Sequence, residues 1–196
     1  MNKLARDELF SLEEYAEKRP EFRKKVLAHK KHRQVGIGDH ATLYFEDRLT
    51  VQYQVQEMLR IEKIFEGTGI EEELGAYNPL IPDGTNFKAT FMIEYADVEE
   101  RREALSRMVG IEDRVWVRVE GMDKVYAIAD EDLERATEDK TSAVHFLRFE
   151  LAGDMIDQIR NGAGFGFGFD HPNYMEENYP LAKDCQKSLA ADLAAN

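Results

Sequence analysis

The chain has 196 residues, of which 43% are hydrophobic and 33% are charged, and its formal net charge is −13. A chain of this length and composition can bury the core of one domain, which excludes general disorder, and its charge disfavours a nucleic-acid partner. Because no apolar run reaches the roughly 18 residues of a membrane span, and because the acidic start lacks the apolar core of a secretory signal, we expect a cytoplasmic protein without a membrane partner.

Helix signals dominate the first third of the chain. The segment SLEE at 11–14 forms a capping box, and Pro20 suits the first turn of a second helix that runs to about residue 33. A short strand is predicted at 41–46, followed by a helix over 50–66 with an apolar stripe at helical spacing. The glycine, proline and asparagine residues between 67 and 86 indicate an ordered connection.

Strand signals dominate the second half of the chain. The segment KATFMIEY at 88–95 alternates in polarity, and RVWVRVE at 114–120 alternates with Trp116 on the outward face. A hairpin-length turn joins the second of these to 124–129, which predicts antiparallel pairing. Two further strands are expected at 141–151 and 163–171, with helices over 98–109, over 154–161 and from 181 onward.

This order of elements favours an α+β fold over a doubly wound parallel sheet. We expect a single domain over residues 1–196, with an antiparallel or mixed sheet of about four to six strands covered by helices. A mainly helical part at 1–66 would pack on the sheet-containing part at 87–196.

Glycine and phenylalanine alternate in the segment GAGFGFGF at 162–169. The spacing departs from the dinucleotide-binding fingerprint, and the chain carries no phosphate-binding P-loop, so we expect no nucleotide cofactor. In a strand the glycines would share one face, which admits either a closely packed helix or a flat ligand.

Charged and imidazole side chains interrupt otherwise apolar patterns at a few positions. Glu57 lies on an apolar helix face and Arg148 on a strand that is apolar on both faces, so each should have a charged or hydrogen-bonding partner. His145, on the same strand as Arg148, fits either a buried histidine with satisfied partners or a metal ligand or acid–base group. Cys185 is the only cysteine, which excludes thiolate metal cages.

A mixed carboxylate–imidazole set is the candidate metal site. Its members would be Glu57, Glu94, His145 and His171, with His29 in reserve. Such ligands suit iron, manganese or zinc. No two of them show a diagnostic spacing, so the site depends on their convergence in space. Arg148 would then hold a ligand in place or bind an anionic substrate.

Several long motifs together resemble a known family. SLEEY, RPEFR, YQVQEMLRIE, AYNPLIPDG, ATFMIEY, KTSAVHFLRFE and DHPNY are similar to the bacterial domain-of-unknown-function family numbered 3501. The resemblance runs nearly end to end and implies no activity, cofactor or catalytic residue. Its association with rubrerythrin-like and iron–sulfur oxidoreductase proteins implies a redox or peroxide-handling context and a partner of that kind.

Two functions follow from these observations. The first is a cytoplasmic metal-binding protein, with iron favoured over other divalent metals, that serves redox or peroxide defence. The alternative is a non-catalytic accessory module that docks onto an oxidoreductase through the basic helix at 18–33 or through an exposed Trp116 face. The basic helix also fits a solvated surface that offsets the acidic remainder of the chain.

Overall fold

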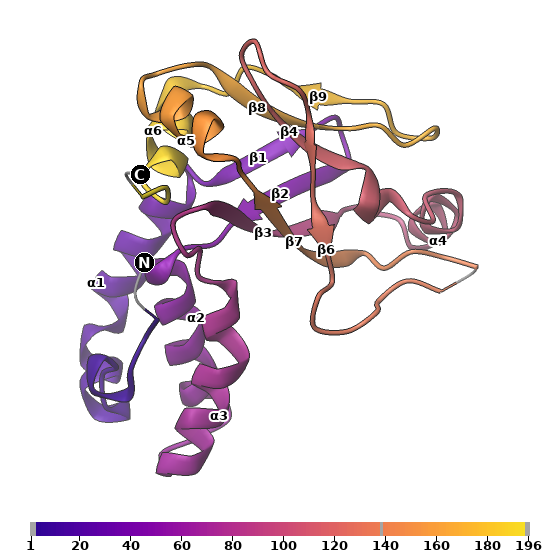
Figure 1. Cartoon of the computed structure of the whole chain (residues 1–196). Helices are drawn as coiled ribbons and strands as arrows, with labels where there is room; N and C mark the ends of the chain where they lie inside the picture. The colour runs from indigo at the N-terminus through magenta and orange to yellow at the C-terminus, as the bar shows by residue number, and fades with distance from the viewer. Residues whose placement is uncertain (1–2, 138, 195–196) are drawn as a thin grey trace.

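The computed structural model describes residues 3–137 and 139–194, so both ends of the expected 1–196 domain lie outside the described residues. Two antiparallel sheets form the centre of this structure (Figure 1). The first sheet has the order β1 (Gln34–Ile37), β2 (Ala41–Phe45), β3 (Asn86–Ile93), β7 (Val144–Glu150) and β6 (Ile128–Ala129). The second has the order β5 (Val125–Tyr126), β4 (Val115–Val119), β8 (Phe165–Phe169) and β9 (Glu177–Asn178).

Helices lie around and beside the two sheets. The α-helices of the described residues are α1 (Leu12–Lys30), α2 (Arg48–Ile61), α3 (Gly67–Tyr77), α4 (Val98–Arg107), α5 (Gly153–Arg160) and α6 (Lys183–Ala190). Short 3₁₀ turns are η1 (Arg6–Glu8), η2 (Asn78–Leu80) and η3 (Ile111–Arg114). The predicted α+β class is confirmed, with two sheets in place of the one expected.

The two sheets share a core rich in phenylalanine. The ring centroids of Phe45 and Phe167, from opposite sheets, lie 4.7 Å apart, and those of Phe87 and Phe165 lie 5.7 Å apart in a stacked arrangement. The alternation predicted for β3 is confirmed, because its odd-numbered residues from Phe87 to Ile93 are buried. Lys88, Thr90 and Met92, which are partly exposed, therefore face away from this core.

The glycine face of β8 is covered by the chain itself. A Cβ built on Gly168 would lie 2.3 Å from the Trp116 ring, and one on Gly166 would lie 2.3 Å from the carbonyl oxygen of Asn178. Trp116 lies on the outer side of its sheet as expected, but the prediction that it is exposed is wrong, since only 1% of it reaches solvent. The bare glycine lets the indole lie flat on the strand, where Nε1 donates to Asp170 (3.1 Å).

The N-terminal helix is continuous, contrary to the two helices predicted around Pro20. α1 contains Pro20 in its interior, and this proline is exposed. The missing N–H and the ring therefore lie on the solvent side, where the helix tolerates one lost hydrogen bond because Tyr15 and Val26 remain buried on its other face.

Helix α3 and strand β1 are among the elements that were not predicted. The segment 67–86, expected as a connection, begins with helix α3, which buries Leu74 despite three glycines. Strand β1 pairs with β2 across a tight turn in which Gly38 has φ 63°, a left-handed conformation that suits glycine. Local glycine content masked both elements, and their pairing with neighbours stabilises them.

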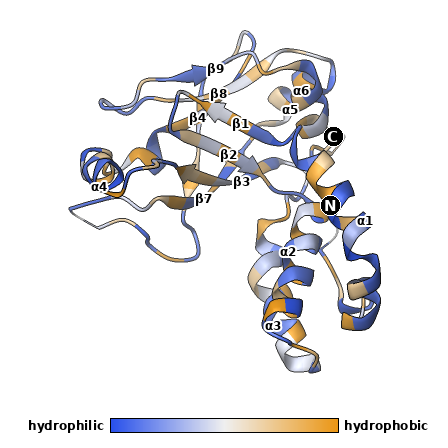
Figure 2. Cartoon of the chain, turned by 180° about the vertical axis from the view of Figure 1, so that it is seen from behind, coloured by the Kyte–Doolittle hydropathy of each residue, from blue (hydrophilic) through white to orange (hydrophobic). Residues whose placement is uncertain are grey.

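Helices α1, α2 and α3 form a helical arm that extends away from the sheets (Figure 1). The arm has its own apolar cluster, formed by Leu4, Val51, Val55, Leu59, Leu74 and Ile81. The outer helix α1 is largely hydrophilic along its length (Figure 2). Helices α4, α5 and α6 instead add side chains to the core between the sheets. The arm meets the first sheet at one end, where α1 leads into β1, α2 follows β2 and η2 precedes β3.

Candidate functional site

A cavity of about 800 Å³ lies between η2 and the outward face of strands β3 and β7. Tyr77 and Leu80 line it on the helical side, and Lys88, Phe146 and Arg148 line it on the sheet side. Successive residues of a strand point to opposite faces of the sheet. In β3 and β7 one set of alternate residues points into the core, so Lys88, Phe146 and Arg148 face the cavity. Ligand pockets in proteins typically measure about 300–1,000 Å³. We call this space the β3–β7 cavity.

Lys88 is the half-buried cation of the β3–β7 cavity. Its Nζ donates to the carbonyl oxygens of Pro79 (2.7 Å) and Ile81 (3.1 Å), which ties η2 to β3. Burial lowers the pKa of Lys88 from its ordinary value. Among residues 3–137 and 139–194, its ammonium forms no ion pair with a carboxylate. The Lys88 ammonium is therefore hydrogen-bonded to neutral carbonyls, while the carboxylates of Asp83 and Glu131 act on its charge from a distance.

Arg148 lies directly opposite Lys88 on the neighbouring strand. Its guanidinium donates two hydrogen bonds to Glu131 (2.8 and 2.7 Å) and one to Glu150 (2.5 Å). The prediction that Arg148 has a charged partner is confirmed. Because two carboxylates already balance this arginine, Lys88 is better placed than Arg148 to hold an anion.

The structure does not bring the four candidate metal ligands together. The described residues contain no group of three or more histidine, cysteine, aspartate or glutamate side chains that could hold a metal ion. Glu57 lies on α2 in the helical arm, whereas Glu94 follows β3, is exposed, and lies 3.5 Å from the Tyr44 hydroxyl. Metal binding by these residues therefore stays a prediction without a common site to support it.

Glu57 instead joins α2 to α1. Its carboxylate accepts hydrogen bonds from the Tyr15 hydroxyl (2.6 Å) and twice from Arg19 (2.7 and 2.9 Å). Arg19 holds the pKa of Glu57 down to about 2. The predicted partner of Glu57 is thus confirmed, and its role is to hold two helices together.

His145 has partners at both ring nitrogens. Nδ1 lies 2.6 Å from Asp130, and Nε2 lies 2.8 Å from the Thr141 hydroxyl and 3.8 Å from Glu112. The ring is fully buried, and Asp130 also accepts from the backbone N–H of Phe146 (2.9 Å). This network matches the structural interpretation of His145, since it fastens the segment before β7 to the core.

His171 is held by backbone groups. Its Nε2 donates to the carbonyl oxygen of Val109 (3.1 Å), and its Nδ1 accepts from the N–H of Asn173 (3.2 Å). Both nitrogens of this histidine are therefore occupied, and a metal could reach either only if one of these hydrogen bonds broke.

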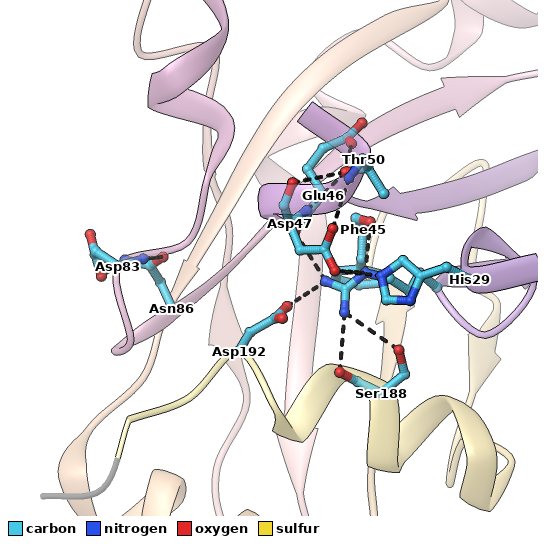
Figure 3. A network of polar contacts seen from close by, with 10 residues as sticks. His29, Phe45, Glu46, Asp47, Thr50, Asp83, Asn86, Ser188 and Asp192 are labelled. Atoms are coloured by element: carbon cyan, nitrogen blue, oxygen red, sulfur yellow. Dashed lines mark hydrogen bonds and ion pairs between the residues drawn. The ribbon is translucent and has the colours of Figure 1, made fainter. Parts of the chain in front are cut away.

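A buried polar network around Arg33 escaped the sequence analysis (Figure 3). Arg33 belongs to the end of the basic segment interpreted as a solvated surface, but it is only 2% exposed. Its guanidinium donates to the carbonyl oxygens of Phe45 (3.2 Å), Glu46 (3.0 Å) and Ser188 (3.1 Å), and it pairs with Asp192. Arg33 thereby ties the end of α6 to the end of β2.

The pKa values of two carboxyl groups in this network are shifted in opposite directions. Burial raises the pKa of Asp192 to about 6, with Arg33 offsetting part of that effect. Burial acts the same way on Asp47, but Arg33, the N–H of Thr50 and His29 outweigh it, so the pKa of Asp47 is lowered. His29, the reserve candidate ligand, contacts Asp47 through Nε2 at 2.5 Å. The network borders a second cavity of about 610 Å³.

Comparison with known proteins identifies the family. The family described as "Protein of unknown function (DUF3501)" matches residues 3–193, and the chain belongs to it. A solved structure from Burkholderia pseudomallei K96243, described as a novel protein of unknown function, is 54% identical with a TM-score of 0.93. The match covers 98% of this chain and 100% of that one. No curated protein matches the chain.

Within the residues that the structure describes, no helix is long and apolar enough to cross a membrane.

Proposed function

We propose that the protein is a small-molecule-binding protein whose ligand occupies the β3–β7 cavity. The observation that carries this proposal is the cavity itself, which has a volume of about 800 Å³ between a helical wall and a sheet wall. One wall is the apolar surface of Tyr77 and Leu80, and the other combines the Phe146 ring with the Lys88 ammonium. A largely apolar space with a few fixed polar groups is the usual form of a ligand site.

The proposal is also supported by the hydrogen bonds and ion pairs that hold the two walls of the cavity in place. Lys88 and its two carbonyl partners hold η2 at a set distance from β3, and the paired Arg148 is held by Glu131 and Glu150. Walls fixed in this way lose little conformational entropy when a ligand enters. The site is therefore largely formed before binding.

A neutral fluorescent probe tests this function without involving charge. We expect N-phenyl-1-naphthylamine to show a saturable fluorescence increase with the wild-type protein. Ala76→Trp places a large ring in the lining of the cavity and should weaken this binding at least about tenfold, which is a change of about 1.4 kcal/mol. Ala28→Trp, at an exposed position of α1, is the matched control and should bind like wild type.

Two results would overturn the proposal. One is a wild-type protein that gives no saturable signal. The other is equal binding by Ala76→Trp and Ala28→Trp, with both variants melting near the wild-type temperature. That second result would place the probe outside the cavity.

The iron, redox and partner hypotheses have a separate test. Elemental analysis of purified protein, with His145→Ala as the control, would support an iron protein if stoichiometric metal were present in wild type and lost in the variant. A rubrerythrin-like or iron–sulfur oxidoreductase partner stays a prediction. Two docking surfaces were proposed for this partner. Because Trp116 is buried, the basic face at 18–33 is the remaining candidate.

A further inference from the structure

The acidic side chains that line the β3–β7 cavity already have partners. Asp83 accepts hydrogen bonds from Asn86 (2.7 Å) and from the hydroxyl of Thr85 (3.1 Å). The other two acids pair with arginines: Glu131 with Arg148, and Asp132 with Arg135. These contacts lower the pKa of all three carboxyls, although burial partly opposes them. At neutral pH these three carboxylates are therefore ionised, and each is already bound to a partner within the protein.

Two lysines of the same cavity have no such partner. Lys88 and Lys3 both line the space, and neither forms an ion pair with a carboxylate of the described residues. Lys88 also faces Arg148 directly across the strand pair, and like charges in that position repel. An anion beside Lys88 would relieve this repulsion and would receive a charge-assisted hydrogen bond.

The surroundings of Lys88 favour a singly charged group. The cavity lining holds three cations, Lys3, Lys88 and Arg148, against three carboxylates, Asp83, Glu131 and Asp132, so its formal net charge is zero. Bringing a phosphate dianion next to three carboxylates would add repulsion that one ammonium does not offset. A carboxylate brings only one negative charge, which the Lys88 ammonium can offset. The remainder of the cavity is lined by the side chains of Tyr77, Leu80 and Phe146.

We propose that the ligand of the β3–β7 cavity is an amphipathic carboxylate, with its carboxylate on the Lys88 ammonium and its apolar body between Leu80 and Phe146. This inference rests on the proposed binding function and names its ligand class. An aliphatic acid and an aromatic acid share this chemistry, and the packing against Tyr77 and Phe146 determines which of them binds more tightly.

Displacement of the neutral probe by matched acids and alcohols tests the ligand class. Octanoate and 4-phenylbutyrate are compared with 1-octanol and 4-phenyl-1-butanol at pH 7.5, where both acids are ionised. Each acid should displace N-phenyl-1-naphthylamine at a concentration at least about tenfold lower than its alcohol. The two acid arms separate an aliphatic from an aromatic body.

Lys88→Met should remove the preference for the acid while leaving the alcohols unaffected. Lys24→Met, at an exposed position of α1, is the control and should keep the preference. Because Lys88→Met also removes two hydrogen bonds to η2, the comparison of acid with alcohol on wild-type protein stands as an independent measurement.

The outcomes separate the two proposals. If alcohols displace the probe as well as the acids do, the carboxylate class is wrong and binding in the cavity stands. A second outcome is that the acids displace the probe at lower concentration than the alcohols and a folded Lys88→Met variant keeps that full difference. In that case another group binds the carboxylate, and the assignment to Lys88 is wrong. If the probe does not bind at all, the proposed function itself fails.

Discussion

Gly168→Ala should destabilise the protein, because the added methyl group would collide with the Trp116 ring. A Cβ built on Gly168 lies 2.3 Å from Cζ2 of Trp116 and 2.8 Å from both Cε2 and Cη2. Carbon atoms in contact prefer separations of about 3.5–4.0 Å, so the ring or the strand must move by about 1 Å or more.

Neither group moves at low cost. The indole is 1% exposed, its Nε1 donates to Asp170 (3.1 Å), and the Lys124 ammonium lies 4.3 Å from the ring centroid. Overpacking of a close-packed site costs about 1–3 kcal/mol, and three short contacts with a fixed ring place this variant near 2–3 kcal/mol. For a chain of this length, that loss lowers the melting temperature by about 4–12 °C.

Gly36→Ala provides the matched control, because it also replaces a strand glycine but has no atom within 4 Å of the new Cβ. Its melting temperature should equal or slightly exceed that of wild type. Thermal unfolding followed by circular dichroism measures both variants. Trp116 is the chain's single tryptophan, so its emission reports the ring alone and should shift to longer wavelength in Gly168→Ala. Equal melting temperatures and unchanged emission would refute the reasoning.

Three further predictions concern charged side chains. Asp192→Asn should flatten the pH dependence of stability between about pH 4 and 6, because the raised pKa of about 6 makes the folded state hold the proton more tightly than the unfolded chain. In wild type the stabilisation that comes from protonated Asp192 is complete below pH 3.8 and is lost as the pH rises through about 6. Melting temperatures that change with pH in parallel for the two proteins would contradict this prediction. Glu57→Gln should cost about 1–3 kcal/mol in urea unfolding at pH 7, whereas exposed Lys24→Ala should change stability by less than about 0.5 kcal/mol. The Glu57 contribution should fade as the pH falls from 4.5 towards 2, and an equal loss at pH 2 and 7 would count against it. Arg148→Met should cost about 1–2 kcal/mol by the same measurement, since two carboxylates lose their cation; an unchanged midpoint would show that the pairs contribute nothing.

The sequence by itself determined the local structure wherever one signal dominated. Ser11 and Glu14 form the predicted capping box, and the alternation of 88–95 correctly places one face of β3 in the core. The sequence also predicted that Glu57 and Arg148 have charged partners, because a charged side chain within an apolar pattern needs an opposite charge or a hydrogen bond.

The tertiary structure alone decided which distant groups meet. Trp116 is buried because Gly168 of another strand leaves room for its ring. Arg33 is buried because the segment that follows α6 supplies Asp192 from 159 residues away. The β3–β7 cavity likewise needs η2 to stand opposite Lys88. Periodicity specifies the face on which a side chain lies, but it carries no information about what packs against that face. For this reason the sequence indicated Arg148 as a residue of interest, while only the packing of strand, turn and helix assigned the unpaired charge to Lys88.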